Sequence, residues 1–195
     1  MRAFVLLILL AAAGYYLYSR HGASAAPPSG DELPSEIAWR MTSRDEHGGD
    51  TLVQIIAVSG NRWRVESTSP SKHRTLVFVS DGSAAAVSDP KAPRDAAASF
   101  DPRPPMRLLL KELRHSSPET TGQIAGRPYL RFTQKVNGTP CQVWADPKTR
   151  FPFQMRALGT FSYFTVLPTL SDRDIPNLFS IHSLTPLLSR YATAQ

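Results

Sequence analysis

The sequence predicts a mainly β fold, a meander of about nine or ten antiparallel strands with one inserted helix. Three observations predict it. From residue 37 onward apolar side chains repeat with a period of two, as in strands that bury one face. Turn pairs, above all Asn137-Gly138, divide the apolar runs into hairpins. Seventeen prolines in 195 residues argue against long helices, while the 42% apolar share suffices for one core.

The alternation places the strands along the chain. Gly60-Asn61 joins two apolar runs so closely that they form a hairpin, and Asp81-Gly82 closes a second hairpin in the same way. The stretch before residue 129 has the composition of a turn, and the stretch after 168 that of a closing loop with a short edge strand. The expected strands are 37–42, 51–59, 62–68, 74–80, 83–89, 129–136, 141–145, 153–158 and 159–168.

One segment has the pattern of a helix. Residues 104–116 begin with two prolines, which suit the first turn of a helix. Their apolar side chains recur at helical spacing and form one stripe, made of Met106, Leu109, Leu110 and Leu113. The polar, proline-rich loop 90–103 precedes them, and a loop of that length is often a mobile or functional segment.

A hairpin with an unusual concentration of charged and aromatic residues covers 143–155, with the sequence VWADPKTRFPFQM. Asp146 and Pro147 stand where an Asp-Pro-x-Thr turn needs them, because the Asp side chain bonds its own backbone and Pro presets φ. We therefore expect the Asp146 carboxylate to shape a turn between two strands rather than to take part in chemistry.

The chain begins with an apolar run, residues 3–18, between Arg2 and Arg20. The run is shorter than the roughly 20 residues that cross a bilayer comfortably, but its last tyrosines and Arg20 suit the headgroup level of a membrane anchor. The alternative is a signal peptide cleaved after the small residues 23–25. Both alternatives export the remainder of the chain.

These observations predict four parts. Residues 1–22 form an N-terminal apolar helix, as membrane anchor or signal segment, and the Pro/Ala/Ser-rich residues 23–36 form a linker. The β domain covers 37–182, and 183–195 is a C-terminal tail with the length of a short helix.

Several functions are disfavoured. The net charge is +6, but the cations are scattered singly along strands, so we expect no nucleic-acid partner and only a loose attraction to anionic lipid. We expect no enzyme, cofactor or metal site, because the five histidines are far apart and nucleotide-loop and hydrolase motifs are missing. Cys141, the single cysteine, reads as a small apolar side chain within a strand.

Four stretches resemble the LolA/LolB-like periplasmic proteins, the carriers and acceptors of outer-membrane lipoproteins. They are GNRWRVE (60–66), the Asp81-Gly82 hairpin, the 143–155 hairpin and IPNLF (175–179). Such relatives typically carry a W-x-D-x-x-T-x-x-P pattern in this hairpin, which is matched here by Trp144, Asp146, Thr149 and Pro152. No cysteine follows the apolar run, so the chain differs from the lipidated acceptor, and its anchor differs from the soluble carrier.

The resemblance implies a curved antiparallel sheet that forms an unclosed barrel, with the helix across its mouth and an apolar cavity for acyl chains. The ligand would be a lipid or an acylated protein, bound at the bacterial inner membrane facing the periplasm, or in the periplasm if the N-terminal segment is cleaved. The side chains expected to line this cavity are Trp39, Trp63, Phe78, Met106, Leu109, Leu110, Leu113, Phe132, Trp144 and Tyr163.

An alternative function uses the same fold without a lipid. The curved sheet would bind a polypeptide of the cell envelope, as a non-enzymatic interaction or sensing module, and the anchor would set its location. The sequence does not separate this function from lipid binding, because aromatic side chains in a sheet are more often core than ligand contacts.

Overall fold

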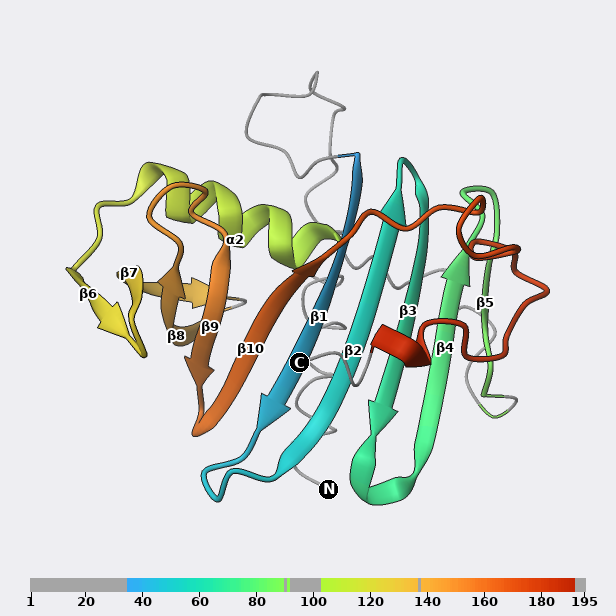
Figure 1. Cartoon of the computed structure of the whole chain (residues 1–195), viewed down its shortest axis with the longest axis horizontal. Helices are drawn as coiled ribbons and strands as arrows, with labels where there is room; N and C mark the ends of the chain where they lie inside the picture. The colour runs from blue at the N-terminus through green and yellow to red at the C-terminus, as the bar shows by residue number, and fades with distance from the viewer. Residues whose placement is uncertain (1–34, 90, 92–102, 137, 192–195) are drawn as a thin grey trace.

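The computed structural model describes residues 35–89, 91, 103–136 and 138–191. The expected N-terminal helix over 1–22 and nearly all of the linker lie outside these residues, as do the side chains of 103–108. Figure 1 shows the chain as one large twisted sheet with a helix along one side.

Ten antiparallel strands form a single sheet in the order β5-β4-β3-β2-β1-β10-β9-β8-β7-β6. This confirms the mainly β fold with one α-helix in the described part of the chain. The strands are β1 (Glu36–Arg44), β2 (Asp50–Ser59), β3 (Arg62–Ser69), β4 (Arg74–Ser80), β5 (Ala85–Val87), β6 (Thr120–Ile124), β7 (Arg127–Val136), β8 (Thr139–Ala145), β9 (Pro152–Ala157) and β10 (Thr160–Leu167). The helix is α2 (Arg103–His115), and two 3-10 turns are η1 (Pro70–Lys72) and η2 (Ser189–Tyr191).

The sheet is a meander in which the first strand also pairs with the last. Strand β1 pairs with β10 as well as with β2, so that Met41 lies opposite both Phe164 and Gln54. The two ends of the sheet are β5 and β6, which are consecutive along the chain but do not pair, so the sheet is not closed into a barrel. Helix α2 belongs to the connection between these two strands.

Two segments differ from the sequence-based expectation. Residues Thr120–Ile124, expected as a turn, form the edge strand β6, because their backbone pairs with β7 despite a weak apolar alternation. The edge strand expected within 171–181 is wrong, since this segment folds as successive turns. Its amides bond carbonyls three residues back, as from Asp174 to Ser171 at 3.1 Å.

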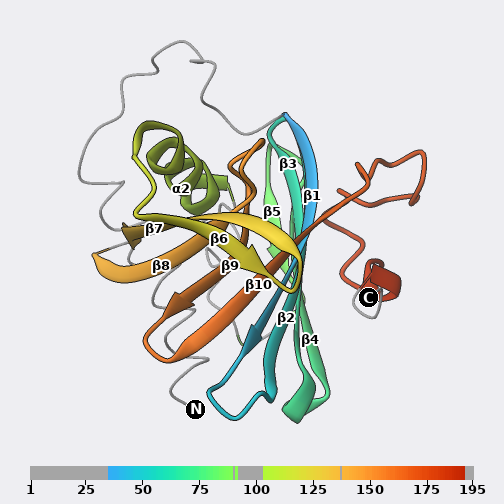
Figure 2. The ribbon, with the colours of Figure 1, turned by 60° about the vertical axis from the view of Figure 1, so that its left-hand side comes forward.

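Both faces of the sheet carry a buried cluster, as strands with apolar residues at all positions require. The face that α2 covers, called the inner face below, holds Ile37, Trp39, Ile56, Val58, Trp63, Val65, Phe132, Cys141, Val143, Ala145 and Phe164 together with leucines of the helix. The opposite, outer face is covered over β1–β3 by residues 168–191, whose Leu170, Ile175, Leu178, Phe179 and Leu188 pack on Ala38, Ile55 and Ala57. Figure 2 shows α2 and the C-terminal segment on opposite sides.

A buried ion pair holds the C-terminal segment in place. Arg64 and Glu66 point outward from β3, are 0% and 3% exposed, and bond each other at 2.7 Å. Arg64 donates to the carbonyls of Leu178, Ser183 and Thr185, and the Glu66 carboxylate accepts the amides of Leu187 and Leu188. Both side chains alternate along β3 with the inward-pointing Trp63 and Val65, and the C-terminal segment buries them.

Within the part of the chain that the structure describes, no helix has the length and apolar character of a membrane span.

Candidate functional site

The inner face gathers most of the side chains that the sequence proposed for an apolar cavity. Trp39, Trp63, Leu109, Leu110, Leu113 and Phe132 are all buried in one cluster between the sheet and α2. Phe78 is half-buried and packs against the same cluster. The helical spacing of the three leucines explains the contact, because residues three and four apart share one face of a helix.

The inner face continues beyond this cluster as a half-buried apolar surface. Met41, Phe78 and Met155 come from β1, β4 and β9, point to the same side as Trp39, and are only partly covered. Two polar pairs border this surface: Ser43 with Ser162, whose hydroxyls are 3.1 Å apart, and Gln54 with Ser67, whose amide and hydroxyl are 3.3 Å apart. The inner face is therefore apolar near α2 and polar near the far ends of the strands.

The 143–155 hairpin holds the C-terminal end of α2. Arg150 donates to the carbonyl oxygens of Leu113, Arg114 and Ser116, the last two at 3.0 and 3.1 Å. The last carbonyls of a helix have no partner within the helix, and a guanidinium is well suited to several of them at once. Its carbon also lies 5.8 Å from the centre of the Phe132 ring.

Asp146 builds the turn from which Arg150 projects. Its Oδ1 accepts from the amides of Lys148 and Thr149, both at 3.0 Å, and from the Thr149 hydroxyl at 3.2 Å. The Thr149 amide is the main cause of a lowered pKa for the Asp146 carboxyl, with the Lys148 amide and the Thr149 hydroxyl acting in the same direction. The expectation that this carboxylate shapes a turn is confirmed. The same turn positions Arg150.

Two of the proposed residues are not part of this cluster. Trp144 alternates with Val143 and Ala145, which point inward, so its own side chain lies on the outer face. Tyr163 is likewise on the outer face, opposite in direction to Phe164, and is 36% exposed. The side chain of Met106 lies outside the described residues.

Sequence reasoning missed several inner-face residues. Met41, Val143, Met155 and Phe164 belong to the inner face but were not proposed. Strict alternation from Trp39 would have found Met41. In place of Phe164 and Val143, the prediction named their neighbours Tyr163 and Trp144, which the structure places on the outer face.

The site offers apolar contact and a few polar atoms rather than reactive groups. Among the residues that the structure describes, no three histidine, cysteine or carboxylate side chains converge as metal ligands would. Cys141 is buried in the inner cluster at 3% exposure. What this face can do chemically is cover an apolar molecule.

No protein-family model and no curated protein matches the chain. Among solved structures, a LolA superfamily protein from Nitrosomonas europaea is similar over 78% of this chain and 94% of that one, at 11% identity and a TM-score of 0.33. PNGF-II is similar over 74% of this chain, at 11% identity and a TM-score of 0.35, and the chain spans only 30% of it.

The sequence resembles LolA-like proteins, and one of these structural neighbours is a protein of that superfamily. With identities near 11% and TM-scores below 0.5, neither neighbour indicates what this chain binds.

Proposed function

We propose that this chain binds a hydrophobic ligand, a lipid or the acyl chain of a lipoprotein, against the inner face of its sheet and beside α2. It would do so as an exported, membrane-anchored domain that handles lipids or lipoproteins in the bacterial cell envelope. It would act by binding, without catalysis.

The half-buried surface of Met41, Phe78 and Met155 is the observation that carries this proposal. The outer face over β1–β3 is covered by residues 168–191, whereas Met41, Phe78 and Met155 on the inner face pack against the buried cluster but are only half-buried. A partly uncovered apolar surface next to a core marks a ligand or partner site more often than an isolated exposed residue does.

The energetics suit an acyl chain. Each methylene taken out of water contributes about 0.8 kcal/mol, so a few methylenes on this surface give useful affinity. Ser43, Ser67 and Ser162 are buried, and the hydroxyls of Ser43 and Ser162 bond each other. The half-buried Gln54 amide is therefore the group of this border next to which the polar part of an amphipathic ligand would lie.

A photoactivatable fatty acid tests the proposal on the full chain. After irradiation, we expect cross-links to map by peptide mass spectrometry to β1 and β9, on inward residues such as Met41 and Met155. The double variant Met41→Gln/Met155→Gln should lose most of this labelling, because an amide without a partner opposes apolar contact.

Val53→Gln serves as the matched control. Val53 is also half-buried, but it points to the outer face of β2, opposite Thr42 and Thr68. It should leave the labelling unchanged. Labelling confined to residues 3–18, or equal labelling in all three proteins, contradicts the proposal. A chain that carries no lipid but captures an envelope polypeptide would favour the interaction function instead.

A further inference from the structure

A second surface lies on the outer face of the sheet, over the strands that residues 168–191 leave uncovered. In Figure 1 the C-terminal segment passes over β2, β3 and β4, and no described segment lies in front of β9 and β10. The aromatic side chains at outward positions of these strands and their neighbours are Tyr129, Trp144, Phe161 and Tyr163. No described segment covers these rings, so packing in the core does not explain why aromatic residues occur at these positions.

Arginines accompany these rings. Arg44 of β1 lies over the Tyr163 ring and Arg156 of β9 over the Phe161 ring, each at 5.3 Å from guanidinium carbon to ring centre. Phe161 and Tyr163 stack on each other, with centres 6.5 Å apart and planes 20° from parallel. The register places Arg44, Phe161 and Arg156 in one row across three strands, and Tyr163 in the next row. These four residues are called the arginine–aromatic patch below.

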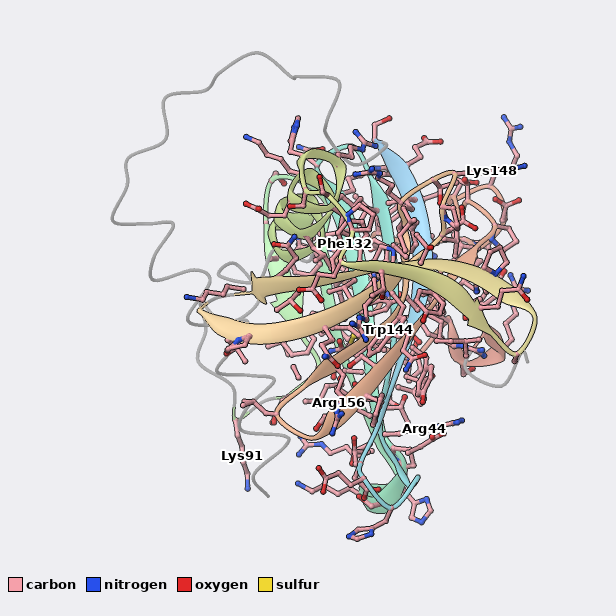
Figure 3. All side chains as sticks on the ribbon, turned by 90° about the vertical axis from the view of Figure 1, so that its left-hand side faces the viewer. Arg44, Lys91, Phe132, Trp144, Lys148 and Arg156 are labelled. Atoms are coloured by element: carbon pink, nitrogen blue, oxygen red, sulfur yellow. The ribbon has the colours of Figure 1, made fainter. Side chains whose placement is uncertain are left out.

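The second row extends the patch. Tyr163 lies opposite Gln154, then come Trp144 and Arg131 on β8 and β7. Figure 3 shows Trp144, Arg156 and Arg44 along this part of the sheet, with Phe132 nearer to α2. The buried Arg131 Nε makes no hydrogen bond to any described residue, and the nearest carboxylate oxygen, of Glu119, is 3.8 Å away.

Cations predominate among the charged side chains of this face. The outward positions of β7–β10 include cations and no carboxylate: Arg127, Arg131, Lys135 and Arg156. Arg44, on β1, is paired with Asp50 at 2.6 Å, and Arg131 forms a longer ion pair with Glu119 at 3.8 Å, so these two contribute less net charge than Arg156. No described carboxylate lies within ion-pair distance of Arg156. The face therefore complements an anionic partner.

From this geometry we infer that the outer face of β7–β10 rests on an anionic phospholipid bilayer surface. Aromatic rings and arginines together are the residues favoured at the headgroup level, and each cation near an anionic leaflet adds about 1 kcal/mol of attraction. Bases of single-stranded nucleic acid need free ring faces, whereas Phe161 and Tyr163 are stacked on each other and lie under guanidinium groups.

The length of the N-terminal part agrees with this inference. The apolar run 3–18 is a candidate anchor, and the linker 23–36 spans about 50 Å at most when extended. An anchored domain on such a tether would remain close enough to its membrane to lie against it. The inference concerns a different face from the proposed ligand site and does not depend on it.

Quenching of Trp144 by lipids with a nitroxide headgroup tests the inference in full-length protein reconstituted into vesicles. Trp39 and Trp63 are buried at 2% and 5% exposure, and Trp144→Phe gives their background. We expect strong quenching in vesicles of phosphatidylglycerol and phosphatidylcholine and weak quenching in phosphatidylcholine alone. High salt should abolish the difference, because at about 1 M the screening length is only about 3 Å.

The double variant Arg131→Gln/Arg156→Gln should shift the equilibrium away from the bilayer by on the order of tenfold and lose the quenching. Lys72→Gln/Lys111→Gln removes the same charge from exposed positions elsewhere and should keep it. Equal quenching in both vesicle types, or equal loss in both double variants, overturns the inference. A third outcome also overturns the inference: the protein binds an oligonucleotide or an acidic polypeptide, and its Trp144 is not quenched by lipid. In that outcome the Arg131→Gln/Arg156→Gln variant would no longer bind the oligonucleotide or polypeptide. Fatty-acid labelling of the inner face should be unaffected by these variants.

Discussion

At the scale of single residues, Arg150 connects a turn to a helix. Its guanidinium is the partner of three carbonyls at the end of α2, and two of these belong to Leu113 and Ser116, which are not exposed. Arg150→Ala should lower the free energy of unfolding by roughly 1–3 kcal/mol, because carbonyls lose a charged donor. It should also speed hydrogen exchange in the last turn of α2.

Urea unfolding and amide exchange measure these effects. Arg150→Lys should recover only part of the stability, since an ammonium does not span three carbonyls as a guanidinium does. Lys148→Ala, at an exposed position of the same turn, should change the free energy by less than about 0.5 kcal/mol. If Arg150→Ala behaves like Lys148→Ala, the contact does not hold the helix.

Asp81 gives a prediction about pH. The amides of Ala84 and Ser83, in that order, and then the Ser83 hydroxyl lower the pKa of Asp81 to about 2. A carboxyl whose pKa is lower in the folded chain stabilises the fold above its ordinary pKa, and this contribution disappears as the pH falls through the folded value. Stability should therefore decline between about pH 4 and pH 2, and Asp81→Asn should lack this part of the decline.

Carbon-13 NMR titration of the Asp81 carboxyl measures its pKa directly. Ser83→Ala removes the hydroxyl donor, at 2.8 Å, but keeps both amides, and should raise the pKa part of the way toward the ordinary value. A wild-type pKa near the ordinary aspartate value would show that the turn does not bind the carboxylate as the structure has it.

Residue identity alone could not assign each side chain to a face. In the run CQVWAD, residues 141, 143 and 145 alternate with residues 142 and 144, and the alternation alone does not tell which set faces the core. The pairing partners determine which side chains point inward. Phe132 of β7 packs in the inner cluster and lies opposite Val143, so Val143 points inward as well. Pairing is a long-range property, so composition within one strand does not contain it.

At the scale of elements, the C-terminal segment depends on the Arg64–Glu66 pair. Removing one member of a buried pair leaves the other charge without compensation, which typically costs 3–5 kcal/mol. We expect Arg64→Met and Glu66→Leu each to destabilise by roughly this amount, and the double variant to cost clearly less than the sum. Residues 183–188 should exchange their amides faster in all three.

A double-mutant cycle by urea unfolding gives the coupling. The exposed pair of Arg74 and Asp89 is the control, since Arg74 is 55% exposed and Arg74→Met should cost no more than about 1 kcal/mol. Additive costs for Arg64→Met and Glu66→Leu would mean that the two side chains act separately on the segment.

The elements themselves were largely predictable. Turn pairs and alternation placed nearly all the strands and the helix to within a few residues, because these signals are local. β6 and the segment after β10 were not. Thr120–Ile124 is a strand only because β7 lies beside it, and 171–181 has its place from packing on β1–β3. Tertiary contact, which the local sequence does not encode, determined both.

At the scale of the whole molecule, we predict that the N-terminal segment anchors the domain to a membrane. The tyrosines before Arg20 favour an uncleaved anchor, with residues 23–195 outside the cytoplasm. N-terminal sequencing of protein taken from membranes should therefore find the start of the apolar run. A mature chain that begins at Ala26 contradicts the anchor, and cytoplasmic protein with an intact N-terminus contradicts export.

The pairing of the first strand with the last has a consequence for how the chain folds. Every other neighbouring pair in the sheet is a hairpin, whereas Ser43 and Ser162, which meet across the β1–β10 join, are 119 positions apart. Two half-sheets can therefore form from local contacts. Their junction can form only after both half-sheets exist, and until then the edges along β1 and β10 are free. At high concentration the same junction can form between halves of different molecules, which gives a domain-swapped dimer with the contacts of the monomer.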